Sequence, residues 1–131
     1  MSRAEILIVE DHPTMREAMR LILENAGFDT REASDGKTAL SMVRERLPDI
    51  MFLDHNIPGT SGADVLAELK GDAATSSIRV IIITATGEDG REFVLSLGAD
   101  EYFTKPFPPT ELLRTVERVL EGPPEPSPAG S

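Results

Sequence analysis

Five polar residues directly follow short apolar runs in the sequence. Glu10 and Asp11 follow AEILIV, Asp54 follows IMFL, Thr84 follows RVIII, and Lys105 follows EYFT. If each run is a strand of one parallel sheet, these residues meet at the carboxyl edge of the sheet, where open α/β sheets place their ligand sites. Three carboxylates in one pocket require a cation, and a few hard oxygen ligands suit Mg²⁺, which completes its shell with waters or a phosphate oxygen. The pattern therefore predicts a magnesium site built from residues that are far apart in the chain.

Asp54 lies in the segment Pro48 to Gly62, PDIMFLDHNIPGTSG, in which an apolar run delivers one acid into a turn. A carboxylate is a competent nucleophile toward a phosphoryl group when a metal and a fixed cation neutralise the charge on the equatorial oxygens. Lys105 would supply that cation, Thr84 a hydroxyl that donates to a phosphoryl oxygen, and Ala85 the room for the group. On this stretch alone, Asp54 could equally be an ordinary turn aspartate, because Asp, Asn, Pro and Gly are common in turns.

Strand and helix patterns alternate five times, and this alternation must position the five residues. The expected strands are 4–9, 28–33, 50–53, 79–83 and 100–104. The expected helices run from His12-Pro13 to Gly27, from Asp35-Gly36 to Leu47, from Ser61-Gly62 onward, over 88–97, and from Pro108 or Pro109 through Leu120. Right-handed crossovers then build a doubly wound, five-stranded parallel sheet with helices on both faces. The short helix over 88–97, with glycines near its start, is expected to be the mobile element.

Length, charge and composition narrow the class of protein. The chain has 131 residues, enough for a single core, and no cysteine. Its net charge of -10, from 13 Lys and Arg against 23 Asp and Glu, disfavours direct binding to nucleic acid or to anionic membranes. There is no apolar run of membrane-spanning length and no signal-peptide core. We expect a soluble, cytoplasmic domain over 1–121, followed over 122–131 by a proline-rich segment that is a disordered tail or a truncated linker.

Four segments together resemble the response-regulator receiver domain of two-component signalling: ILIVED, MFLDHNIPGTSG, IIITA and ADEYFTKPF, in the order and spacing of that family. The resemblance covers Ile6 to about Leu120. It implies a flavodoxin-like (βα)5 fold with strand order 2-1-3-4-5. It also implies that Mg²⁺ is held by Glu10, Asp11, Asp54 and the backbone carbonyl of Asn56.

The same resemblance implies a phospho-accepting switch, with at most intrinsic self-phosphorylation and autodephosphorylation. Asp54 would accept the phosphoryl group from a sensor histidine kinase or a phosphotransfer protein, and Lys105 would contact that group. Thr84 and Tyr102 would be the switch residues, reshaping the surface of the fourth helix, fifth strand and fifth helix for a downstream output protein or domain. His55, beside the acceptor, would affect access to it.

Two other functions fit the residues less well, and some points stay open. A phosphatase of the haloacid dehalogenase type needs a second acid two residues after its nucleophile, where this chain has Asn56. A flavodoxin needs a phosphate cradle after its first strand, where Glu10 and Asp11 would repel the flavin phosphate. Imidazole also suits softer metals, which leaves a metal role open for His12 and His55. The last helix, ELLRTVERVLEG, lacks the arginine pattern of the family's dimers, so either a monomer or a phosphorylation-dependent dimer is expected.

Overall fold

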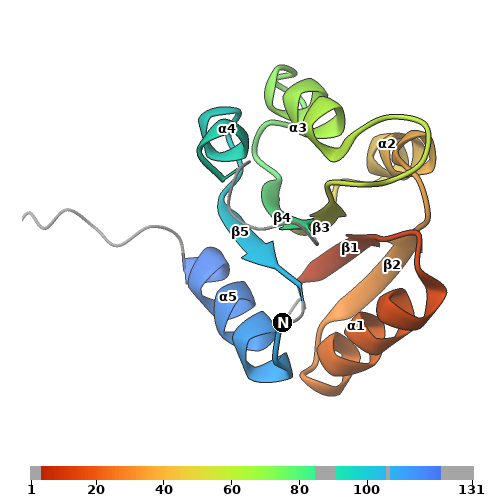
Figure 1. Cartoon of the computed structure of the whole chain (residues 1–131), viewed down its shortest axis with the longest axis vertical. Coiled ribbons are helices and arrows are strands. Elements are labelled where there is room, and N and C mark those ends of the chain that lie inside the picture. The colour runs from red at the N-terminus through yellow and green to blue at the C-terminus, as the bar shows by residue number, and fades with distance from the viewer. Residues whose placement is uncertain (1–3, 85–90, 106, 122–131) are drawn as a thin grey trace, which may run out of the picture.

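A computed structural model describes residues 4–84, 91–105 and 107–121. Strands and helices alternate through these residues as the sequence predicts, and Figure 1 shows the helices wrapped around a central sheet. The elements are β1 (Glu5–Val9), α1 (Pro13–Asn25), β2 (Asp29–Ala33), α2 (Gly36–Glu45), β3 (Ile50–Asp54), α3 (Gly62–Lys70), β4 (Arg79–Thr84), α4 (Arg91–Ser96), β5 (Glu101–Thr104) and α5 (Pro109–Glu121). Every predicted strand is present, with its ends within one residue of those expected.

The five strands form one parallel sheet in the order β2-β1-β3-β4-β5, which confirms the predicted order. The register aligns Val9 of β1 with Leu53 of β3, and Thr84 of β4 with Thr104 of β5. These pairings bring the carboxyl ends of the strands to a common level. The residues that follow the strands therefore share one edge of the sheet.

Helices cover both faces of the sheet, with α1 and α5 on one side and α2, α3 and α4 on the other (Figure 1). Successive residues of a strand point to opposite faces. Ile6 and Ile8 of β1 accordingly pack in the cluster that contains Met19, Leu112 and Val116 from α1 and α5. The alternate β1 residues Leu7 and Val9 pack against α2, α3 and α4. Burial on both faces is the reason that the central strands are apolar between their terminal residues.

The predicted second helix is too long at its end. It stops at Glu45, Arg46 has extended backbone angles, and Leu47 is 48% exposed instead of lying on the inner face. Arg31 of β2 supplies a physical reason, because its guanidinium donates hydrogen bonds to the carbonyl oxygens of Met42 and Arg46. The Met42 carbonyl also accepts from the backbone N–H of Arg46, whereas the Arg46 carbonyl lies beyond the helix, and the neighbouring strand supplies its donor.

Two other parts of the helix prediction have different outcomes. The fourth helix is described over Arg91–Ser96, and its predicted start at residue 88, near Gly87 and Gly90, lies outside the described residues. On α5, Leu112, Val116 and Val119 are buried as expected, whereas Leu120 is 41% exposed. The predicted segment 122–131 also lies outside the described residues. Among the helices described, none has the length and apolar character needed to cross a membrane.

Candidate functional site

The carboxyl edge of the sheet gathers the residues that the sequence singled out for chemistry. Glu10 follows β1, Asp54 ends β3, Thr84 ends β4 and Lys105 follows β5. Glu10 is fully buried, and Asp54 and Thr84 are each only 3% exposed. The Nζ atom of Lys105 lies 2.9 Å from Oε1 of Glu10 and 3.0 Å from Oδ2 of Asp54. One ammonium group therefore bridges two buried carboxylates that come from different strands.

Burial and the neighbouring charges shift the pKa values of Glu10 and Lys105 in opposite directions. Burial raises the pKa of Glu10, although Lys105 and the backbone N–H of His12 partly oppose the rise. For Lys105, burial alone would lower the pKa, but the hydrogen bonds and charges of Glu10 and Asp54 outweigh it and raise the pKa. Lys105 is therefore protonated and positively charged, and its single charge only partly neutralises the two carboxylates.

The loop after β3 fixes the position of Asp54. The backbone N–H of Asn56 donates to Asp54 Oδ1 at 3.0 Å, and the N–H of His55 donates to the carbonyl of Ile83 on the next strand at 2.8 Å. Gly62, at the start of α3, donates its N–H to the His55 carbonyl at 2.9 Å. A Cβ atom at Gly62 would lie 2.7 Å from both the Asp54 carbonyl oxygen and His55 Cα, closer than real Cβ contacts occur. Glycine at this position lets α3 begin directly against the backbone of the acid.

Arg16 of α1 holds the other side of the site, and the sequence analysis missed it. Its Nη1 donates to the backbone carbonyl of Glu10 at 2.7 Å, and its Nε donates to Glu32 of β2 at 3.0 Å. The guanidinium thus ties the turn after β1 to the edge strand. The sequence did place Arg16 one helical turn after His12, and therefore near the acids that precede the helix. Its partner Glu32 on β2 could not be predicted locally, because the order of strands in the sheet decides which residues lie beside Arg16.

The acids form a donor set of the kind that hard cations bind. Ligand atoms of Glu10, Asp11 and His12 lie within 4.8 Å of one another, and Asp54 is bridged to Glu10 through Lys105. Glu10 Oε1 is buried and forms an ion pair with Lys105 Nζ at 2.9 Å. The same ammonium also serves Asp54, so two buried carboxylates share one positive charge and a further cation beside them is favourable. Carboxylate oxygens are the ligands that Mg²⁺ prefers, so the residues present fit this ion.

The remaining predicted site residues have varied positions. Asp11 and Asn56 are exposed and His55 is half-buried beside Asp54. Tyr102 is 9% exposed and packs on the side of the sheet covered by α2, α3 and α4, opposite Ile82 in the register. Ala85 lies outside the described residues.

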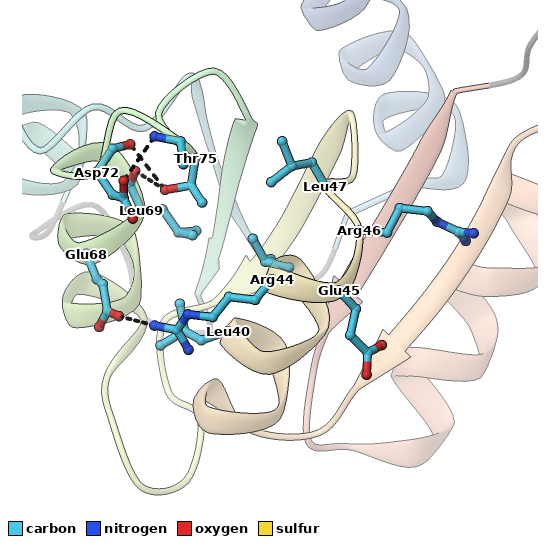
Figure 2. Close-up of a pocket in the computed structure, with 11 residues that line it drawn as sticks. Leu40, Arg44, Glu45, Arg46, Leu47, Glu68, Leu69, Asp72 and Thr75 are labelled. Atoms are coloured by element: carbon cyan, nitrogen blue, oxygen red, sulfur yellow. Dashed lines mark hydrogen bonds and ion pairs between the residues drawn. The ribbon is translucent and has the colours of Figure 1, made fainter.

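A hollow of about 360 Å³ lies elsewhere, between the end of α2 and the loop that follows α3 (Figure 2). Part of its polar lining is paired internally, with Arg44 3.0 Å from Glu68 and the Thr75 hydroxyl donating to the Leu69 carbonyl at 2.7 Å. None of its described lining residues belongs to the acidic site. The candidate functional site is therefore the carboxyl edge of the sheet, where buried charges converge.

The fold and the site together define a doubly wound α/β domain with buried acids, a threonine and a lysine at the carboxyl edge of its sheet. Residues 6–117 match the family model of the response regulator receiver domain. The chain belongs to this family, as its four sequence segments predicted.

Curated relatives are named as a transcriptional regulatory protein and as a DNA-binding response regulator. The phosphate regulon transcriptional regulatory protein PhoB of Pseudomonas aeruginosa is 41% identical over 116 residues, which cover 88% of this chain and 51% of the relative. The DNA-binding response regulator MtrA of Mycolicibacterium smegmatis is 41% identical over 120 residues, covering 90% of this chain and 51% of the relative. This chain thus spans about half the length of the curated relatives it matches.

Solved structures show the same fold. A putative response regulator from Chloroflexus aurantiacus has a TM-score of 0.87 and 30% identity, covering 92% of this chain and 99% of that one. The receiver domain of the sensor histidine kinase PA1611 from Pseudomonas aeruginosa has a TM-score of 0.84 and 26% identity, covering 92% of this chain and 100% of that one. That structure has a magnesium ion coordinated in its active site cleft.

Proposed function

We propose that Asp54 accepts a phosphoryl group from the phosphohistidine of a sensor kinase or a phosphotransfer protein. The observation that carries the proposal is the environment of this carboxylate, which Asn56 N–H holds at Oδ1 and Lys105 contacts at Oδ2. An Asp54 oxygen forms the new bond to phosphorus while the bond from phosphorus to the imidazole nitrogen breaks, and that nitrogen keeps the electron pair. Lys105 is placed to stabilise the charge on the phosphoryl oxygens.

Magnesium is the proposed cofactor of this transfer. Glu10, Asp11, Asp54 and the backbone carbonyl of Asn56 would hold Mg²⁺, which when bound supplies positive charge to the oxygens of the phosphoryl group. The burial of Glu10 and Asp54 around a single lysine supports this role, because one ammonium leaves part of their negative charge unneutralised. The magnesium ion in the receiver domain of PA1611 supports it independently.

We assign the response to the face formed by α4, β5 and α5. Thr84 lies at the end of β4 beside β5, and Tyr102 lies on β5 three residues before Lys105. In the proposed switch, the Thr84 hydroxyl donates to the phosphoryl group and Tyr102 changes its packing, which alters the surface that an output protein or domain reads. The acidic charge of this chain favours a partner protein over DNA as the direct target of the described domain.

Intact-mass measurement after incubation with acetyl phosphate and Mg²⁺ tests the acceptor. The wild type should gain one phosphoryl adduct and Asp54→Asn should gain none. Asp64→Asn, at an exposed acid in the first turn of α3, is the matched control and should keep the adduct. An undiminished adduct in Asp54→Asn would show that another residue is the acceptor.

Tyrosine fluorescence tests the switch, because Tyr102 is the chain's only tyrosine and there is no tryptophan. Phosphorylation should change the emission of the wild type. Thr84→Ala should take up the phosphoryl group and show a smaller change. Equal changes in both proteins would remove Thr84 from the switch.

A further inference from the structure

The turn between β1 and α1 is held by an arginine and not by a side-chain cap. His12 is the N-cap residue of α1, and its side chain makes no capping hydrogen bond. Helices more often begin at Ser, Thr, Asp or Asn, whose side-chain oxygens accept a hydrogen bond from the first turn. Here the backbone N–H of Arg16 donates to the His12 carbonyl at 2.9 Å, and its Nη1 donates to the Glu10 carbonyl at 2.7 Å.

Both backbone polar groups of Glu10 are tied to the edge strand β2. The N–H of Glu10 donates directly to the Ala33 carbonyl at 3.0 Å. The carbonyl of Glu10 reaches β2 through Arg16, whose Nε donates to Glu32 Oε1 at 3.0 Å. Glu32 and Ala33 are the last two residues of β2. The end of the outermost strand therefore positions the backbone that carries the buried Glu10 side chain.

The Glu32 carboxylate serves two arginines with separate oxygens. Oε1 accepts from Arg16, whereas Oε2 lies 3.2 Å from Nε of Arg20, one helical turn further along α1. The contact with Arg16 therefore does not depend on Arg20. The Arg16 and Glu32 side chains are 22% and 34% exposed, so solvent screens their attraction and the ion pair adds little to stability. Its geometric effect is larger, since outer contacts that orient a metal ligand change metal affinity by about 10–100-fold.

We propose that Glu32 is a positioning residue for the proposed metal site: through Arg16 it sets the place of the Glu10 backbone, and thereby the affinity of the site for Mg²⁺. Glu32 acts through a second residue, so its loss should cost less affinity than the loss of Arg16. The inference rests on the proposed metal-binding role of Glu10. It makes the end of β2 part of the machinery for phosphoryl transfer, although none of the site residues expected from the sequence lies on this strand.

Calorimetric titration of the full chain with Mg²⁺ tests the role of Glu32. Glu32→Ala should weaken Mg²⁺ binding by roughly three- to tenfold. Glu32→Gln keeps an oxygen that can accept from Arg16 Nε and should retain most of the affinity. The matched control is Glu24→Ala, which removes the same charge together with an ion pair to Arg20 and a hydrogen bond from the Thr30 hydroxyl. It should leave Mg²⁺ affinity unchanged. Equal affinity in the wild type and Glu32→Ala, or equal losses in Glu32→Ala and Glu24→Ala, would overturn the proposal.

A double variant separates positioning from a plain effect of charge. If Glu32 acts through Arg16, adding Glu32→Ala to Arg16→Gln should weaken Mg²⁺ binding no further than Arg16→Gln alone. Either additive losses in the double variant or equal losses in Glu32→Gln and Glu32→Ala would assign the effect to the charge of Glu32 and overturn the proposal.

The rate of phosphoryl uptake from acetyl phosphate gives a second readout. In Glu32→Ala, the Mg²⁺ concentration that gives half of the maximal rate should rise with the dissociation constant, while the rate at saturating Mg²⁺ stays at the wild-type value. A lower rate at saturating Mg²⁺ would contradict a role confined to positioning a metal ligand. A missing adduct on Asp54 beside Glu32-dependent Mg²⁺ binding would refute the proposed function alone. A normal adduct beside Glu32-independent Mg²⁺ binding would refute this inference alone.

Discussion

Replacing Lys105 by methionine removes the charge that bridges the site while retaining most of the side-chain length. The lost ammonium lies 2.9 Å from Glu10 and 3.0 Å from Asp54, whose side chains are only 1% and 5% exposed. Removing one partner of a buried ion pair costs about 3–5 kcal/mol, and of an exposed pair at most about 1 kcal/mol. Because the Lys105 side chain is 17% exposed, we expect an intermediate loss of about 2 kcal/mol in the free energy of unfolding. The melting temperature should fall by roughly 6–10 °C for a domain of this size.

Mg²⁺ should restore most of this loss, because it would neutralise the same two carboxylates. By linkage, about 2 kcal/mol of recovered stability corresponds to roughly 30-fold tighter Mg²⁺ binding by Lys105→Met than by the wild type. Urea unfolding followed by circular dichroism, with and without saturating Mg²⁺, measures the recovery. Calorimetric titration measures the affinity directly.

Lys70→Met is the matched control for this experiment. The Lys70 side chain is 18% exposed, and its Nζ donates to the carbonyl oxygens of Ser76 at 3.1 Å and Ile78 at 2.6 Å. Its removal should cost stability equally with and without Mg²⁺. If Lys105→Met lost equal stability with and without Mg²⁺, Lys105 and Mg²⁺ would not act on the same charges.

Three further variants test other contacts of the structure. Gly62→Ala should cost about 1–3 kcal/mol in urea unfolding and reduce the phosphoryl adduct. The reason is that the new Cβ would lie 2.7 Å from the backbone carbonyl oxygen of Asp54. A variant as stable as the wild type would contradict that close contact. Arg16→Gln should weaken Mg²⁺ binding about tenfold in calorimetry, because Arg16 holds the backbone of Glu10. Arg20→Gln also loses an ion pair to Glu32 of β2 and should leave Mg²⁺ binding unchanged. Equal effects of the two variants would show that Arg16 does not position the site. Asp35 caps α2, and hydrogen bonds from the backbone and hydroxyl of Thr38 lower its pKa. The stability that this carboxylate contributes is fully present above its unfolded pKa of 3.8 and is lost as the pH falls through its lower folded pKa. Asp35→Ala should therefore reduce the free energy of unfolding at neutral pH and reduce it much less in acid. Ser61 caps α3 through a hydroxyl that does not titrate, so Ser61→Ala should lose the same free energy of unfolding at neutral and acid pH in urea unfolding. If the loss in Ser61→Ala also became smaller in acid, the pH effect would belong to the whole domain and not to Asp35.

The strand pattern was readable from the sequence because the central strands are buried on both faces. Such strands tolerate no polar residue until they reach the edge of the sheet, so Asp54 and Thr84 stand out at the ends of apolar runs. Helix ends were less readable. The end of α2 depends on hydrogen bonds from Arg31, a residue of the neighbouring strand, and no local pattern reports a partner that distant.

The site shows the same division. The residue types at the strand ends were predicted, but the contacts that hold them were not. The link from Arg16 to Glu10 and the close approach of Gly62 to Asp54 are contacts between different elements. They exist only once α1 and α3 are packed on the sheet.

The sequence by itself determined the order of elements, the parallel sheet and the set of polar residues at its carboxyl edge, because apolar runs and turn residues act locally along the chain. It did not distinguish Glu10 from Asp11, which are adjacent acids after the same strand. The tertiary structure did: Glu10 is fully buried and contacts Lys105, whereas Asp11 is exposed next to His12. The physical reason is that burial and ion pairing depend on which elements the crossovers bring together, and those neighbours lie far away in the sequence.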